Sequence, residues 1–88
     1  MNLKQLIIAF LAPRDPAAYT EAAIAQRLNK SMMLDRRCTV DEVHIALRAL
    51  HKMGLVGMQI NQLDDSVVWQ ISHEGVKEWA IAGRVTGV

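Results

Sequence analysis

The fold is decided by residues 39–71, TVDEVHIALRALHKMGLVGMQINQLDDSVVWQI. The stretch begins with Thr39–Glu42, TVDE, which matches the capping box: the threonine hydroxyl accepts from the third helical amide and the glutamate reaches back to the cap. Apolar residues then recur at helical spacing, at Val43, Ala46, Leu47, Leu50 and Met53. Gly54 fits the left-handed position that commonly follows a helix. These signals predict a helix over residues 40–53.

Two runs rich in β-branched and apolar residues follow this helix. They occupy residues 55–60 and 67–71, and the polar segment 61–66, NQLDDS, separates them. A polar segment between two such runs is typical of a hairpin turn. The sequence therefore predicts a two-stranded hairpin over residues 55–71.

The rest of the chain carries weaker helix signals of the same kinds. Pro13 ends an apolar stripe near the N-terminus, and Ala17–Tyr19 after it is expected to be extended. Thr20 followed by Glu21 starts a second helix, since threonine caps well and a carboxylate suits the first turn. Ser72 caps a last helix in the same way. The predicted helices cover residues 2–12, 21–29, 40–53 and 73–82.

Length and composition indicate one small globular domain, residues 1–88. A hydrophobic fraction of 51% is too high for a disordered chain. Ten basic and nine acidic side chains give a net charge of +1, which leaves nucleic-acid binding open because a local patch matters more than the total. A single cysteine, Cys38, fits a reducing cytosol, and the apolar run 6–12 is too short to span a bilayer. We expect a cytoplasmic protein without membrane association.

Three segments resemble parts of winged helix-turn-helix proteins. Residues 20–29, TEAAIAQRLN, resemble the "T-x-x-x-I-A-x-x-L" second helix of that superfamily. Residues 40–56, VDEVHIALRALHKMGLV, resemble its recognition helix, which ends in "L-x-x-x-G-L-V". Residues 67–79, VVWQISHEGVKEW, resemble the "x-W-x-I-T-x-x-G" element that closes the wing. The three lie within residues 20–79, about two-thirds of the 88-residue chain.

This resemblance is to small bacterial or phage regulators of the MarR and ArsR types, with no subfamily assigned. It implies a mainly helical α+β fold with a three-helix core, a two-stranded β-hairpin wing and a C-terminal helix. It also implies double-stranded DNA as the partner, with the helix over residues 40–53 in the major groove and the wing over a phosphate strand. The implied function is transcription regulation. Such regulators often dimerise through their terminal helices, so a homodimer is a further expectation.

The outward arc of the predicted recognition helix carries groups that suit DNA. A helical wheel places on this arc Asp41, His44, Ile45, Arg48, Ala49 and Lys52. Arg48 could bind guanine through two hydrogen bonds, and Ile45 could touch a thymine methyl. We predict base contacts from His44, Ile45 and Arg48 and a phosphate contact from Lys52. The alternative is an ordinary solvated helix face.

A basic connector precedes this helix. Its cationic residues are Arg27, Lys30, Arg36 and Arg37. If the connector lies along the duplex, Lys30, Arg36 and Arg37 would contact phosphates; the alternative is a solvated loop. The apolar segment 32–34, MML, is expected to touch the core.

Acidic residues argue against a simple DNA reader. Asp41 and Glu42 occupy the first turn of the recognition helix, and the wing tip carries Asp64 and Asp65 without a basic residue. Carboxylates repel phosphate, so the usual phosphate contact of a wing is not expected here, and turn chemistry explains both tip aspartates. Near-neutral charge, the acidic tip, Ile45 and the apolar connector favour an alternative. In that alternative the winged helix is a protein-interaction module without DNA contact.

Catalytic and metal sites find little support. His44, His51, His73 and Cys38 lack the close ligand spacing of zinc sites, so no metal or cofactor is expected. Cys38 precedes a helix N-terminus, which lowers a thiol pKa, but it has no resolving partner and an incidental cysteine is favoured. The chain has no phosphate-binding loop or nucleophile elbow, and we predict that it is not an enzyme.

Overall fold

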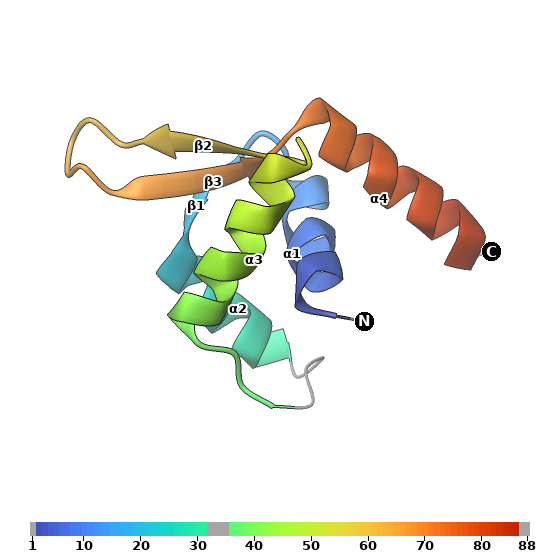
Figure 1. Ribbon diagram of the computed structural model, residues 1–88, viewed down its shortest axis with the longest axis horizontal. Coiled ribbons are helices and arrows are strands. Elements are labelled where there is room, and N and C mark those ends of the chain that lie inside the picture. Colours follow the sequence, from blue (N-terminus) through green and yellow to red (C-terminus); the bar gives the residue numbers. More distant parts are fainter. Residues whose placement is uncertain (1, 32–35, 87–88) are drawn as a thin grey trace.

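The computed structural model describes residues 2–31 and 36–86, with side chains described through Ile81 (Figure 1). The predicted contact of segment 32–34 with the core lies outside the described residues. The elements in chain order are α1 (Leu3–Leu11), η1 (Ala12–Arg14), β1 (Tyr19–Thr20), α2 (Glu21–Ser31), α3 (Val40–Lys52), β2 (Val56–Ile60), β3 (Val67–Ile71) and α4 (His73–Thr86).

The architecture is the predicted mainly helical α+β fold, with helices α1, α2 and α3 around one core and a projecting hairpin, β2 and β3. The sheet has one strand more than predicted. β1 pairs with β3, Tyr19 opposite Trp69 and Thr20 opposite Val68, so the antiparallel order is β1-β3-β2. The extended segment before α2 thereby satisfies backbone groups along the free edge of β3.

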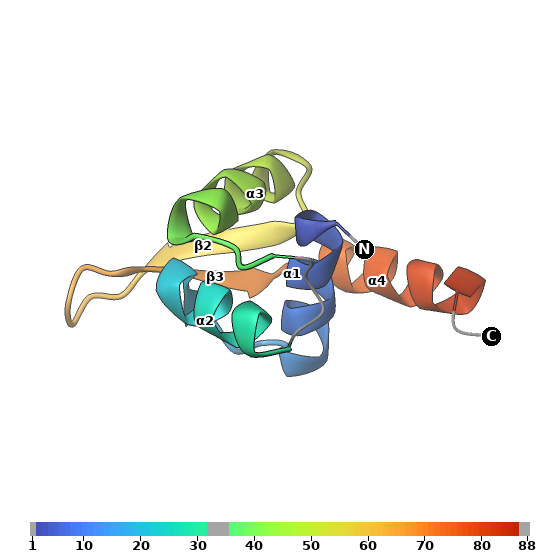
Figure 2. The ribbon, with the colours of Figure 1, turned by 90° about the horizontal axis from the view of Figure 1, so that it is seen from below.

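Local signals define the ends of α3. Thr39 accepts a hydrogen bond from the Glu42 amide at 3.1 Å, and the Glu42 carboxylate accepts from the Thr39 amide at 3.0 Å, which completes the predicted capping box. Gly54 has φ +77°, the left-handed conformation that glycine adopts without strain. The hairpin therefore leaves the end of α3 in a fixed direction (Figure 2).

The core lies between the three helices and the inner face of the sheet. Its largest fully buried side chains are Trp69, Ile7, Leu11, Ile24, Leu47 and Val43. Trp69 is 1% exposed and its ring stands edge-on to His51, 6.0 Å between centroids. Met53, the last residue of the apolar stripe on α3, is instead 62% exposed, because the helix ends at Lys52 and the chain turns there.

Helix α4 begins close to the core and then extends away from it (Figure 1). Gly75 sits so near the end of α3 and the sheet that an added Cβ would lie 2.1 Å from the Leu55 carbonyl oxygen. The helix runs to Thr86, whereas the sequence predicts an end near residue 82. Among its side chains through Ile81, two large apolar ones are exposed, Trp79 and Ile81. No helix within the described residues is long and apolar enough to cross a membrane.

Candidate nucleic-acid interface

The outward face of α3 carries the predicted DNA-contacting side chains. Ile45 is 69% exposed, and Arg48 and Lys52 are exposed one and two turns further along the helix. Neither Arg48 nor Lys52 has a hydrogen-bond or ion-pair partner within the described part of the chain. Their charges are therefore available to an external ligand.

His44 lies on the same face, but a second element holds it. Its Nδ1 is 2.6 Å from Oε2 of Glu21, the first residue of α2, and the same oxygen accepts from the Trp69 indole Nε1 at 3.2 Å. Glu21 thus links α2, α3 and β3 through one carboxylate. Because Nδ1 is engaged, contact of His44 with a base or phosphate would fall to Nε2.

Arg36 is bound by an acid at the start of α3. Its guanidinium reaches Glu42 through two contacts, Nη2–Oε2 at 2.6 Å and Nη1–Oε1 at 3.2 Å, a bidentate geometry. The Arg36 guanidinium, followed by the Thr39 amide, lowers the pKa of Glu42. Glu42 in turn raises the pKa of Arg36. Much of the Arg36 charge is balanced locally, whereas Arg37 is exposed with no ion pair among the described residues.

A side-chain clamp fixes the C-terminal end of the connector. The Asn29 amide nitrogen donates to the Cys38 carbonyl at 3.0 Å, and the Cys38 amide donates to the Asn29 side-chain oxygen at 2.8 Å. The clamp holds Cys38 against α2 with its thiol buried. Burial raises the pKa of this thiol, whereas the sequence predicts a lowered pKa from the nearby helix N-terminus.

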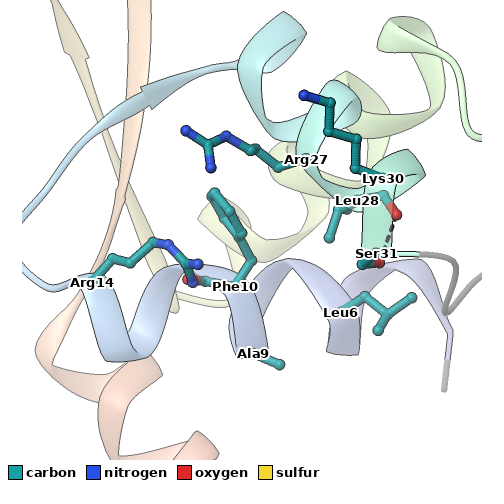
Figure 3. Close-up of a pocket in the computed structure, with 8 residues that line it drawn as sticks. All are labelled: Leu6, Ala9, Phe10, Arg14, Arg27, Leu28, Lys30 and Ser31. Atoms are coloured by element: carbon teal, nitrogen blue, oxygen red, sulfur yellow. Dashed lines mark hydrogen bonds between the residues drawn. The ribbon is translucent and has the colours of Figure 1, made fainter.

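Lys30 lies apart from the α3 face. It is exposed in the last turn of α2, where it lines a pocket between α1 and α2 together with Arg27 (Figure 3). The structure therefore brings Ile45, Arg48 and Lys52 together. It does not add Lys30 to that group.

The wing tip is shaped by its aspartates. Oδ1 of Asp64 accepts from the Ser66 amide at 3.0 Å and from the Ser66 hydroxyl at 2.7 Å, and the hydroxyl contact is the main cause of the lowered pKa of Asp64. Asp65 has φ +59°, which aspartate tolerates better than most residues. These bonds agree with the turn chemistry predicted for the two acids. Leu63 beside them is 95% exposed.

Two contacts at this interface are not predicted from the sequence. Local patterns indicate Glu21 only as a favourable charge in the first turn of a helix, because its partners His44 and Trp69 lie 23 and 48 residues away. The Arg36–Glu42 pair is shorter in range, and a basic residue six positions before a capping glutamate is the signal that could have indicated it. No group of three His, Cys, Asp or Glu side chains able to hold a metal occurs in the described ranges.

Comparison with solved structures identifies the fold as a winged helix. A double mutant of Lactococcus lactis ZitR in the apo form is 21% identical with a TM-score of 0.71, covering 92% of this chain and 54% of that one. The hsRosR-S1 structure is 16% identical with a TM-score of 0.80, covering 98% and 71%. Bacillus subtilis PadR in complex with operator DNA is 12% identical with a TM-score of 0.74, covering 91% and 45%.

Identities this low establish the fold alone, and the chain spans only about half the length of the ZitR and PadR chains that it matches. No model of a known protein family matches the sequence, and no curated protein matches it. The surface of α3 and its surroundings therefore carry the evidence for an activity.

Proposed function

We propose that this protein binds double-stranded DNA sequence-specifically and acts as a small transcriptional regulator in the cytoplasm. The observation that carries the proposal is the outward face of α3, on which Arg48 and Lys52 are exposed without a partner among the described residues. Exposed cations on the recognition helix of a helix-turn-helix, which corresponds to α3, are typical of a protein that reads the major groove. The likeness to PadR, which was crystallised with operator DNA, supports this assignment by analogy of fold.

The roles on α3 follow from side-chain chemistry. Arg48 binds guanine through O6 and N7, and Ile45 contacts a thymine methyl group. His44 reaches a base edge through Nε2, since Glu21 holds its Nδ1. Asp41 in the first turn of α3 faces the groove, where its carboxylate accepts a hydrogen bond from cytosine N4 and would repel a phosphate.

Proposed phosphate contacts come from Lys52 at the end of α3 and Arg37 in the connector, while Arg36 is shared with Glu42. Lys30 at the end of α2 is a further proposed phosphate contact, apart from the reading face. The acidic wing tip provides none. Each neutralised phosphate contributes about −0.9 to the log–log slope of affinity against salt. Three contacts per protomer therefore give about −2.7 and four about −3.6, and a dimer with both protomers on DNA doubles these values.

The proposal is tested by fluorescence anisotropy with duplexes from the protein's own genomic neighbourhood and with random duplexes of equal length. We expect at least one genomic duplex to bind more tightly than random DNA, with a salt slope near those values. If no genomic duplex bound better than random DNA at low salt, the proposal would be overturned.

A homodimer through α4 is part of the proposal. Trp79 and Ile81 on that helix are 40% and 54% exposed, which leaves apolar surface that a second copy could cover. A two-fold dimer would also present two copies of α3 to a palindromic site. Sedimentation of wild type and Trp79→Ser tests it, since the serine variant should lose the dimer that α4 forms.

The second candidate function is a protein-interaction module. It is favoured by exposed apolar side chains on α3 and the wing, namely Ile45, Met58, Ile60, Val67 and Leu63. These do not suit a phosphate-facing surface, and neither do the acids of the tip. A folded protein that bound neither the genomic nor the random duplexes would favour this function.

A further inference from the structure

A pocket of about 410 Å³ lies between α1 and α2, apart from the proposed DNA-reading face of α3 (Figure 3). Of its lining residues, Lys30 alone also has a proposed phosphate contact. Four apolar side chains form its floor, and three cations and a serine complete the lining. The apolar set is Leu6, Ala9, Phe10 and Leu28. The cations are Arg14, Arg27 and Lys30. No acidic residue within the described ranges 2–31 and 36–81 lines it.

The cations differ in how they are held. Arg14 stacks over the Phe10 ring at 4.3 Å and donates to the Phe10 carbonyl at 2.7 Å, which fixes it at the pocket edge. Arg27 and Lys30 are exposed and have no hydrogen-bond or ion-pair partner in the described part of the chain. The pocket therefore suits one apolar side chain flanked by negative charge. A bare anion would leave the apolar floor uncovered.

The same chain carries a segment with that chemistry at the tip of its wing. Leu63 is 95% exposed, the highest value among the large apolar side chains described, and Asp64 and Asp65 follow it directly. The Asp64–Ser66 hydrogen bonds and the left-handed backbone of Asp65 hold the tip in one shape. A preformed tip loses little conformational entropy on docking.

We propose that the wing tip of one copy docks in the α1–α2 pocket of a second copy. Leu63 covers the apolar floor, and Asp64 and Asp65 face Arg27 and Lys30. The wing projects away from the helices in both ribbon views, so its own pocket is out of its reach (Figures 1 and 2). The occupant is therefore another molecule of the same chain.

The size of the contact sets its strength. A single hairpin tip buries much less than the roughly 1,200 Å² at which stable interfaces begin, so one contact gives weak and transient association. Reciprocal exchange of two tips would double the contact and close the assembly, whereas one-way docking would extend it into chains. Because the charged part is solvent-exposed, association should weaken as salt rises.

The test is sedimentation velocity without DNA over a concentration series, with one double variant for each partner surface. Every protein in the series carries Trp79→Ser, which removes the proposed α4 dimer, and the protein with no further change is the parent. The absence of DNA keeps the phosphate role proposed for Lys30 out of the measurement. Asp64→Asn with Asp65→Asn removes the charge of the tip but keeps its shape, since asparagine retains the Oδ1 acceptor and tolerates the left-handed region. Arg27→Gln with Lys30→Gln removes the charge of the pocket.

Each double variant should associate roughly fivefold or more weakly than the Trp79→Ser parent, the scale of two exposed ion pairs. An equimolar mixture of the two should recover part of the association, because it still holds one intact tip and one intact pocket. Leu63→Ser should weaken association even at high salt, since it removes the apolar contact. Lys4→Gln, which changes an exposed α1 lysine outside the pocket, should leave it unchanged.

Three results would overturn the proposal. The Trp79→Ser parent could remain without concentration-dependent association, or both double variants could associate as the parent does. The mixture could also associate no better than either variant alone. None of these outcomes bears on whether α3 binds DNA.

Discussion

One carboxylate, that of Glu42, performs two tasks at the start of α3. It accepts from the Thr39 amide, which caps the helix, and it binds the Arg36 guanidinium through both oxygens. Capping needs only an acceptor oxygen, whereas balancing Arg36 needs a negative charge. The two tasks can therefore be separated by a substitution that keeps the oxygen and removes the charge.

Glu42→Gln is such a substitution. Glutamine satisfies the capping box, so α3 should form as before, while Arg36 becomes free for phosphate. We expect DNA binding to be several-fold tighter. The log–log slope of affinity against salt should be steeper by about 0.9 per protomer, as measured by anisotropy over a range of salt concentrations. Glu74→Gln, on the exposed side of α4, is the control and should change neither. An unchanged slope in the Glu42 variant would remove Arg36 from the interface.

The same pair predicts a pH dependence of stability. Arg36 and the Thr39 amide hold the pKa of Glu42 below its ordinary value of 4.5 in the folded protein. The stabilisation is therefore complete above that value and is lost as pH falls through the lower, folded pKa. Urea unfolding at a series of pH values should show a smaller acid loss in Glu42→Gln than in wild type. The acid loss of stability that remains in the variant should include the contribution of Asp64, because the Ser66 hydroxyl holds the pKa of Asp64 below its ordinary value. Identical acid profiles would contradict this account.

At the scale of elements, α3 and the hairpin follow from local sequence signals. The capping box, the apolar period and Gly54 lie within one contiguous stretch, so each end of α3 was predictable to within a residue. β1 was predicted only as extended, because its pairing depends on β3 some fifty residues later. The apolar spacing predicts that Met53 belongs to the buried face of α3, but the helix ends at Lys52 and Met53 is exposed.

The junction between α4 and the sheet depends on a glycine. A Cβ at Gly75 would lie 2.1 Å from the Leu55 carbonyl oxygen and 2.6 Å from Cδ1 of Ile71, so the start of α4 would have to move. We expect Gly75→Ala to lower the free energy of unfolding by about 1–3 kcal/mol in urea titrations.

A second glycine provides the control for that prediction. At Gly57 the nearest atom to an added Cβ is Cγ of Gln70 at 3.8 Å, an ordinary contact. Gly57→Ala should therefore keep wild-type stability or gain slightly. Equal losses in the two variants would show that the junction is not tightly packed.

At the scale of the whole molecule, charge is distributed unevenly despite a net value of +1. Arg48 and Lys52 form a positive end of α3, and a second group of cations rims the pocket between α1 and α2. The wing tip is acidic. Such a molecule has one surface for a polyanion and another for an acidic segment, so DNA binding and self-association would compete only through Lys30, which is proposed for both.

The candidate site was predictable where it depends on one helix. A wheel drawn on α3 suffices to group Ile45, Arg48 and Lys52, since helical geometry fixes their common face. The surroundings were not predictable, because they arise from tertiary packing. Lys30 lies at a pocket between two other helices, which no local pattern indicates. The Arg36–Glu42 pair has only a weak local signal, the spacing of six residues between them.

The central claim is that α3 reads base sequence, and Arg48 is the residue on which it depends most. Arg48→Ala should be titrated against a bound genomic duplex, its single-base-pair variants and random DNA, with Lys77→Ala on α4 as the control. The account predicts a loss of about 1–3 kcal/mol on the genomic duplex and relaxed discrimination at one base pair, with the control unchanged. An equal loss on every duplex would make Arg48 a phosphate contact. Unaltered binding to all of them would contradict the assignment of α3 as the reading helix.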